Sequence, residues 1–176
     1  MKLGLYNAIY HDRSLPDALR AIASVGLTGI ELNTGGFLPP VHVPNIADIL
    51  ASDTARDDFL GNFEGTGVAI AGLNCNGNPL HPNRAIGGRH ADDIHRSIRL
   101  AARLGQDRVV TMSGLPGGNP GALHQNWVVN AWNSAALDVL DHQWEIATEF
   151  WRETDRIARD HDVTVALELH PQNIVF

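Results

Sequence analysis

The sequence predicts an α/β fold, specifically a (β/α)8 TIM barrel, with residues 1–176 forming a single domain that reaches the fifth strand. Short apolar runs with the character of strands alternate with amphipathic helical stretches in the order βαβαβαβαβ. The strand-like runs are apolar throughout, which is typical of a parallel sheet covered on both faces. The connection at residues 6–14 lacks the G-x-G-x-x-G turn of doubly wound nucleotide-binding sheets, so a barrel is favoured over an open sheet.

The individual elements are predicted from apolar periodicity and from residues that start or stop helices. In the first helix, Ser14 is a good N-cap and Gly26 can close the helix in a left-handed conformation. The predicted strands cover residues 2–8, 28–33, 68–74, 108–112 and 163–169. The predicted helices cover residues 14–26, two pieces between 45 and 64, 90–105 and 135–161. The apolar stripe predicted to face the core on the last helix is Leu137, Leu140, Trp144, Ala147 and Trp151.

Composition and charge argue against several classes of protein. The formal net charge is −7 and no run of Lys or Arg occurs, whereas nucleic-acid binding needs a basic face. The single cysteine, Cys75, excludes a disulfide within the chain and indicates a reducing compartment. Because the sequence contains no long apolar run and its first residues do not resemble a signal peptide, we expect no membrane association and a cytoplasmic location.

Polar side chains follow every predicted strand, at the end of the sheet where barrels keep their chemistry. Amides, imidazoles and aromatic rings are the groups that bind a polyhydroxylated ligand, through hydrogen bonds to hydroxyls and contact with the C–H face. The sequence therefore predicts a sugar-like ligand at this end of the sheet. The residues involved are Tyr6, Asn7, Glu31, Asn33, Asn74, Asn76, Asn78, His81, Ser113, His124, Trp127, Glu168 and His170.

The segments GLNCNGNPLHPN, SGLPGG, QWE, FWRE and LELHPQNIVF resemble the sugar phosphate isomerase/epimerase group of the xylose-isomerase-like TIM barrel superfamily. The resemblance covers essentially the whole chain. It implies one divalent metal, most often Mn²⁺ with Mg²⁺, Co²⁺ or Zn²⁺ as alternatives, at the carboxyl ends of the strands. Glu168 matches the metal ligand that such enzymes carry on strand 5, and the remaining ligands come from strands 6 to 8. We therefore expect the native sequence to continue past Phe176 with three strands that end in such ligands.

The resemblance implies isomerisation or epimerisation of a sugar or sugar phosphate by proton transfer through an enediolate that the metal stabilises. Glu168 is the candidate catalytic carboxylate and metal ligand. The candidate substrate-binding residues are Tyr6, Asn74, His81, Trp127 and His170. Each also has a structural interpretation, such as core packing for Tyr6 or a capped turn for His170, and Glu31 is interpreted as a structural residue, paired with a neighbouring backbone group or a cation.

Three other functions remain open from the sequence. The first is a metal-dependent lyase or dehydratase that acts on keto-sugars or keto-glycosides. The second is an endonuclease of the same superfamily, which the lack of a His-rich cluster and of positive charge disfavours. The third is an inactive barrel fragment that binds sugar without turnover. The edges of a five-stranded sheet would be unpaired, so we expect the 176-residue chain to form homo-oligomers or associate through them, with weak metal binding and no turnover alone.

Overall fold

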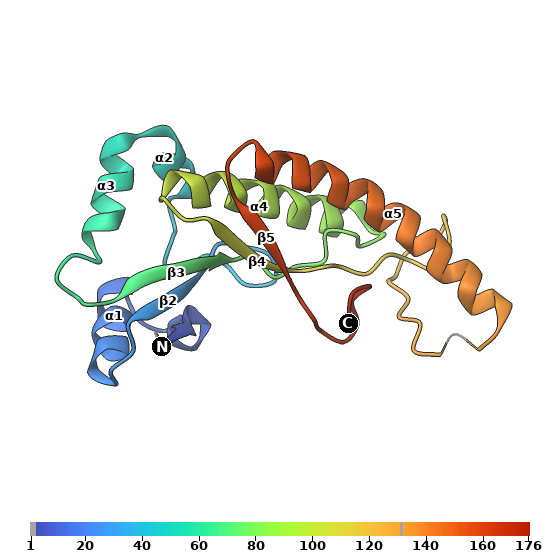
Figure 1. The fold of residues 1–176 in the computed structure, drawn as a ribbon, viewed down its shortest axis with the longest axis horizontal. Helices are drawn as coiled ribbons and strands as arrows, with labels where there is room; N and C mark the ends of the chain where they lie inside the picture. Colours follow the sequence, from blue (N-terminus) through green and yellow to red (C-terminus); the bar gives the residue numbers. More distant parts are fainter. Residues whose placement is uncertain (1–2, 131) are drawn as a thin grey trace.

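The computed structural model describes residues 3–130 and 132–176, and within these ranges it contains one parallel sheet with the strand order β1-β2-β3-β4-β5. Each of the first four strands is followed by helical structure and then by its neighbour in the sheet, which confirms the predicted α/β alternation (Figure 1). Strand β1 and strand β5 are the two edges of this sheet. The strands are β1 (Gly4–Tyr6), β2 (Gly29–Asn33), β3 (Ala69–Asn74), β4 (Arg108–Met112) and β5 (Thr164–Glu168).

The helices begin where side chains cap their first turns. Ser14, Asn83 and Asn133 each accept a hydrogen bond from a backbone N–H of the helix that follows, as N-cap residues do. The cap at Asn83 starts its helix six residues before the predicted start at residue 90. The helical segments are η1 (Asn7–Tyr10), α1 (Leu15–Ser24), α2 (Ile46–Ala51), α3 (Asp53–Gly61), α4 (Arg84–Arg103) and α5 (Ser134–Arg159).

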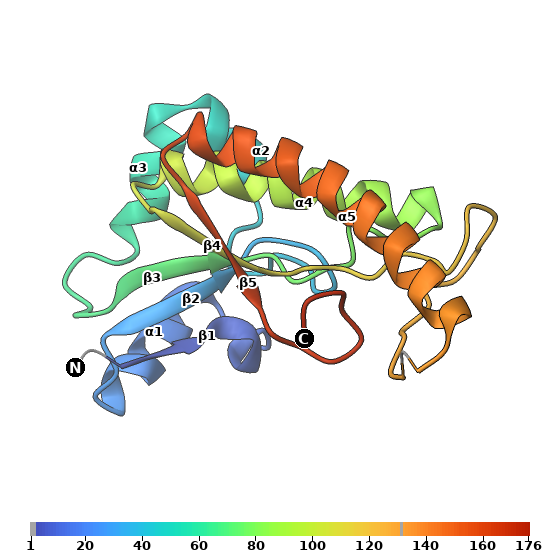
Figure 2. The same ribbon diagram turned by 45° about the vertical axis from the view of Figure 1, so that its right-hand side comes forward.

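One face of the sheet is apolar and packs against the helices. Ile30, Leu32, Leu73 and Val109 are completely buried in a core that also contains the apolar faces of α1 and α4. Helices α4 and α5 run side by side along this face, as both ribbon views show (Figures 1 and 2). The side chains of His95 and Thr154 join the two helices through a contact of 3.0 Å.

Helix α5 buries only part of the predicted stripe, namely Ala147 and Trp151. Trp144 is 48% exposed and Leu137 is 51% exposed, so the prediction that they face the core is wrong. The N-terminal half of α5 extends beyond the sheet, and there it has no strands to cover (Figure 1). Trp151, further along, does pack on the core and donates its Nε1–H to the carbonyl oxygen of Ser113 at 3.0 Å. The buried residues of α5 are Gln143, Ala147, Thr154 and Ala158.

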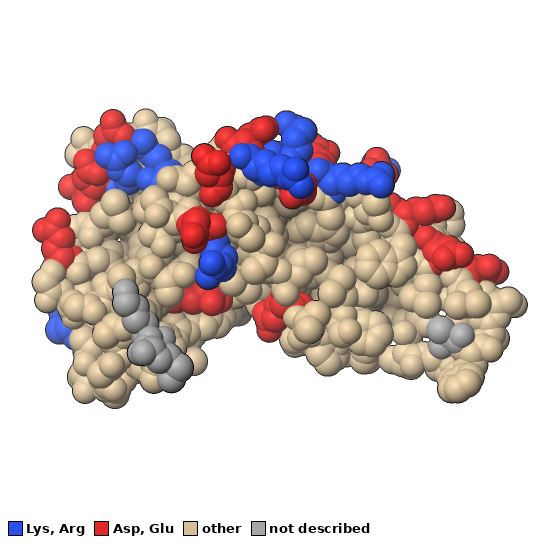
Figure 3. All heavy atoms as spheres, viewed as in Figure 1, with Lys and Arg blue, Asp and Glu red and all other residues tan. Residues whose placement is uncertain are grey.

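Three further properties of the described residues bear on function. None of their helices has the length and apolar character needed to cross a membrane. Charged side chains of both signs gather over the helices on the face shown in Figure 3, whereas the lower part of that face is mostly uncharged. Cys75 is completely buried, and burial raises the pKa of its thiol to about 12, so it is an unreactive core residue.

Candidate functional site

The second face of the sheet, which we call the inner face, carries the polar residues. Residues paired in a parallel sheet point to the same side, as do residues two apart along a strand. Tyr6 pairs with Glu31, Asn33 pairs with Asn74, and Met112 on the neighbouring strand pairs with Glu168. The register therefore brings Tyr6, Asn74 and Glu168, three of the residues predicted from the sequence, to one face of the sheet.

Glu168 is half-buried at the last position of β5, and its orientation is set by a residue far away in the sequence. The Asn76 side chain donates from Nδ2 to Oε2 of Glu168 at 2.8 Å, across 92 positions of sequence. The other oxygen, Oε1, has no hydrogen-bond partner within residues 3–130 and 132–176. Glu168 is thus held by one oxygen and can offer the other to a ligand.

Asn74 and Asn76 connect Glu168 to a second carboxylate. The backbone N–H of Asn76 donates to Oδ1 of Asn74 at 3.1 Å, and Nδ2 of Asn74 donates to Oε1 of Glu31 at 2.7 Å. These contacts form a chain of amides that starts at the end of β3 and reaches β2 on one side and β5 on the other. Asn74 is almost fully buried, so its side chain fixes the positions of its neighbours in the sheet.

Both carboxylates, Glu31 and Glu168, affect the pKa of Tyr6. Its hydroxyl donates to Oδ1 of Asn33 at 3.2 Å. Burial is the largest cause that raises the pKa of Tyr6 to about 12, and the negative charges of Glu31 and Glu168 raise it further. Tyr6 therefore keeps its proton at neutral pH and remains a hydrogen-bond donor on the inner face.

A cavity of about 340 Å³ opens at the carboxyl end of the sheet, and Glu168 itself is not among the residues that line it. His81 and His170, two predicted substrate-binding residues, both line it, together with Asn78 and Met112, the residue paired with Glu168. Nδ1 of His81 accepts a hydrogen bond from the backbone N–H of Asn83 at 3.0 Å. Nδ1 of His170 lies 2.7 Å from the carbonyl oxygen of Pro171. In both residues, Nδ1 thus contacts the backbone within two residues. The two side chains border a cavity that is large enough for a small ligand.

Trp127 is the predicted site residue that packs against the last residue of the chain. Its ring packs edge-on against Phe176, with the ring centroids 5.7 Å apart, and it is not among the residues around the 340 Å³ cavity. Trp132, the other tryptophan of this loop, is 90% exposed. Stacking of either ring on a sugar therefore stays a prediction that the arrangement of the loop does not favour.

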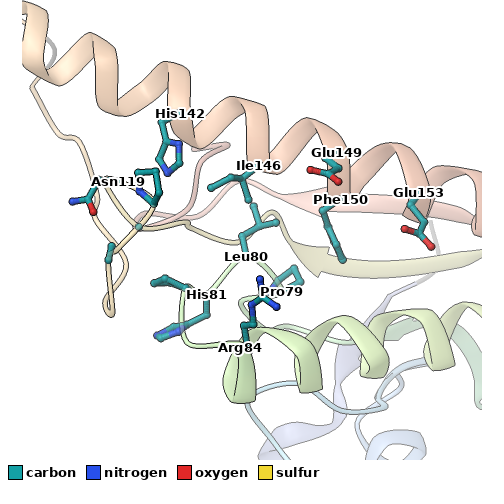
Figure 4. Close-up of a pocket in the computed structure, with 14 residues that line it drawn as sticks. Pro79, Leu80, His81, Arg84, Asn119, His142, Ile146, Glu149, Phe150 and Glu153 are labelled. Carbon is teal, nitrogen blue, oxygen red and sulfur yellow. The ribbon is translucent and has the colours of Figure 1, made fainter.

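A second cavity, of about 470 Å³, lies between the β3–α4 loop and helix α5 (Figure 4). Arg84 and His142 border it, while Glu149 and Glu153 reach it from α5. His81 lines both cavities and so forms part of the wall between them. Residues of α5 form one wall of this second cavity, which therefore lies on the helix side of the fold.

The inner face fits part of a metal site. Carboxylate oxygens suit hard or borderline divalent cations, and Glu168 has one oxygen free for such an ion. A complete site uses about four ligands, however, and no group of three or more His, Cys, Asp or Glu side chains gathers in the part of the chain that the structure describes. The residues present fit one ligand position, and the others would have to come from outside this part.

Two residues of the site were predicted from the sequence only as polar residues near a strand end, without a specific role. Asn76 orients Glu168, and Asn78 ties together the two loops that border the 340 Å³ cavity. The only signal for them is the run of asparagines at alternate positions, N-x-N-x-N, over residues 74–78. This run marks polar groups at a strand end but does not reveal which loops they contact.

Comparison with known proteins identifies the fold family. The family described as "Xylose isomerase-like TIM barrel" matches residues 19–176. The uncharacterized protein YfiH of Bacillus subtilis (strain 168) is 34% identical over 164 residues, which are 91% of this chain and 52% of that protein. The chain therefore spans about half the length of the curated relative that it matches.

Three solved structures share the fold at lower identity. The 3-keto-D-glucoside 4-epimerase YcjR from E. coli superposes with a TM-score of 0.66 at 14% identity, over 98% of this chain and 57% of that one. The probable 3-DHS dehydratase AsbF from Bacillus anthracis gives 0.63 at 16% identity, over 99% and 54%. The IOLI protein with a bound zinc atom gives 0.62 at 20% identity, over 99% and 54%. The parallel sheet and the match over most of its length show that this chain belongs to the xylose isomerase-like TIM barrel family.

Proposed function

We propose that the intact protein is a metal-dependent sugar or sugar phosphate isomerase or epimerase. The observation that carries the proposal is the position of Glu168, which lies at the end of β5 with one free oxygen and pairs with Met112, a residue that borders the cavity lined by His81 and His170. The fold shared with a 3-keto-D-glucoside 4-epimerase supports this choice. Sugars present the hydroxyl and carbonyl groups that such a cavity would bind.

The residues have distinct roles in this proposal. Glu168 holds the divalent cation, for which Mn²⁺ is preferred and Mg²⁺, Co²⁺ or Zn²⁺ are alternatives, and takes a proton from the carbon next to the substrate carbonyl. When bound, the cation supplies Lewis-acid stabilisation of the negative charge that develops on the carbonyl oxygen. Tyr6 donates a hydrogen bond, because its pKa of about 12 keeps it protonated. His81 and His170 contact hydroxyl groups in the cavity.

Exchange of a carbon-bound proton with solvent tests the proposal directly. The intact protein, supplied with MnCl2, is incubated in D2O with ketohexoses, ketopentose phosphates and 3-keto-glucosides. Proton NMR then detects loss of the signal next to the carbonyl. We expect exchange with at least one sugar, and a loss of about 100-fold or more in Glu168→Gln, as for removal of a general base. Glu145→Gln, an exposed carboxylate of α5, is the matched control. No exchange with any sugar, or an unchanged rate in Glu168→Gln, would contradict the proposal.

Elimination is the second candidate reaction, since the fold is shared with a probable dehydratase. It begins with removal of the same proton but ends with loss of a group from the neighbouring carbon. The same NMR samples distinguish the two outcomes. An isomerase or epimerase yields a product of unchanged composition, whereas a lyase yields an unsaturated ketone and the released group.

A further inference from the structure

Glu31 occupies an unusual position for a structural carboxylate. It is half-buried in the middle of β2 on the inner face, where it pairs with Tyr6 on β1 and with Gly72 on β3. Among the residues that the structure describes, no Lys, Arg or His nitrogen lies within 4.0 Å of it. The cation that was one of the two structural partners expected for Glu31 is therefore not found within these residues. The hydrogen-bond partner of Glu31 is the side-chain amide of Asn74, whose Nδ2 lies 2.7 Å from Oε1.

A carboxylate oxygen that no protein group contacts is available to accept a hydrogen bond from a ligand. Oε2 of Glu31 has no hydrogen-bond partner in residues 3–130 and 132–176. The sheet next to Glu31 is also open, because Gly72 has no side chain. A Cβ atom added at Gly72 would meet only the carbonyl oxygen of Arg108, at 3.8 Å. There is therefore room beside Glu31 for a group that donates hydrogen bonds.

Glu31 and Glu168 interact with the same neighbouring residues. Both carboxylates contribute to the raised pKa of Tyr6, so both act on the same phenol. The two are also attached to one strand end, Glu31 through Asn74 and Glu168 through Asn76. A ligand that contacts Glu168 on the inner face thus has a second acceptor available on the β2 side.

We propose that Glu31 is a further substrate-binding residue, which accepts a hydrogen bond from a sugar hydroxyl, and that Asn74 is the positioning residue that orients it. This inference rests on the proposed function, because it assigns a contact within the same site. A neutral hydroxyl is the fitting donor, since a carboxylate accepts strong hydrogen bonds from hydroxyls and the one oxygen left free can hold one of them. Glu31 sets which hydroxyl pattern is accepted, while Glu168 takes part in the proton transfer.

The test compares Glu31→Gln with the unaltered protein on a series of sugars. The probe is the sugar that exchanges fastest in D2O, together with its mono-deoxy derivatives, each lacking one hydroxyl. Glu31→Gln retains an oxygen for Asn74 and nearly the same size, so it should fold. We expect its KM to rise about 10- to 100-fold with kcat changed less than about threefold, as for loss of a charge-assisted hydrogen bond. Glu64→Gln, on the exposed turn after α3, is the matched control.

The mono-deoxy sugars distinguish a direct hydrogen bond between Glu31 and the sugar from a purely structural role of Glu31. In the unaltered protein one deoxy sugar should bind about 10- to 100-fold more weakly than the parent, and Glu31→Gln should abolish that particular difference. Asn74→Ala should reduce the same difference without affecting the other deoxy sugars. If Glu31→Gln discriminates among the deoxy sugars as the unaltered protein does, the inference is wrong, although the proposed function stands.

Failure of the proposed function has a different signature. If no sugar exchanges deuterium, binding of the parent sugars and their deoxy derivatives is measured by titration calorimetry. Sugar binding that weakens in Glu31→Gln but not in Glu64→Gln would support the contact in a protein that binds without turnover. Absence of any binding would overturn both proposals.

Discussion

Asn78 joins the two loops that border the candidate substrate cavity, and its removal has a predictable cost. Its Oδ1 accepts hydrogen bonds from the backbone N–H groups of Leu115, at 2.8 Å, and Leu80, at 3.2 Å. Its Nδ2 donates to the carbonyl oxygen of Leu115 at 3.0 Å. The side chain is only 7% exposed, so water cannot easily replace these contacts.

The magnitude follows from the number of hydrogen bonds. Each buried hydrogen bond contributes about 1 kcal/mol net, and more when its former partner is left unsatisfied. Asn78→Ala should therefore lower the free energy of unfolding by about 3 kcal/mol. Urea denaturation followed by circular dichroism measures it. With a slope of roughly 2 kcal/mol per molar urea, the midpoint should fall by about 1.5 M.

A matched asparagine provides the control. Asn119 also accepts a backbone hydrogen bond, from Gly121 at 3.0 Å, but it lies on an exposed loop. Asn119→Ala should cost less than about 0.5 kcal/mol, as is usual for exposed positions. If Asn78→Ala costs no more than Asn119→Ala, the two loops are not held by Asn78 and the reasoning fails.

Two more predictions concern pH and association. Burial lowers the pKa of His90, so the folded state binds fewer protons at this residue than the unfolded chain does. The contribution of His90 to the free energy of unfolding is therefore complete above the unfolded pKa of about 6.5 and is lost as the pH falls. The urea midpoint should decrease as the pH is lowered from about 7.5 to about 5.5, and His90→Asn should reduce this decrease. An equal decrease in the unaltered protein and in His90→Asn would contradict the prediction. We also propose that the 176-residue chain associates through its edge strands β1 and β5. Leu169→Lys, at a 73% exposed position directly after β5, should lower the mass measured by light scattering, whereas Leu123→Lys, equally exposed on a loop, should not. Equal masses for the two variants would refute edge pairing.

The elements that the sequence predicted well are those with local signals. Residues 108–112 form β4 as predicted, and Ser14 caps α1 while Gly26 follows it with a φ of 79°. These features depend on apolar runs and on capping chemistry within a few residues, which a single sequence displays. The start of α4 was missed because its first turn, with two glycines at 87 and 88, is weakly helical and depends on the cap at Asn83.

The prediction for Trp144 failed for a different reason. Helical spacing shows which residues share a face, but not how far the partner surface extends. Helix α5 continues past the end of the sheet, so Trp144 and Leu137 are on a face with no strands beneath it. Only the relative lengths and positions of the helix and the strands decide this, and they are not local properties.

The sequence by itself determined the order of the strands and the presence of polar residues at their ends, with Glu168 at the end of β5, because strand periodicity and the parallel arrangement place carboxyl ends together. Only the tertiary structure decided which of these residues meet. Asn76 contacts Glu168 across 92 positions, and Asn74 contacts Glu31 across 43. In the tertiary structure, Trp127 also packs against Phe176, and His81 and His170 line the same cavity. Such contacts depend on the register of strands and the path of loops, which are set by packing over the whole sheet and leave no periodic pattern in the sequence.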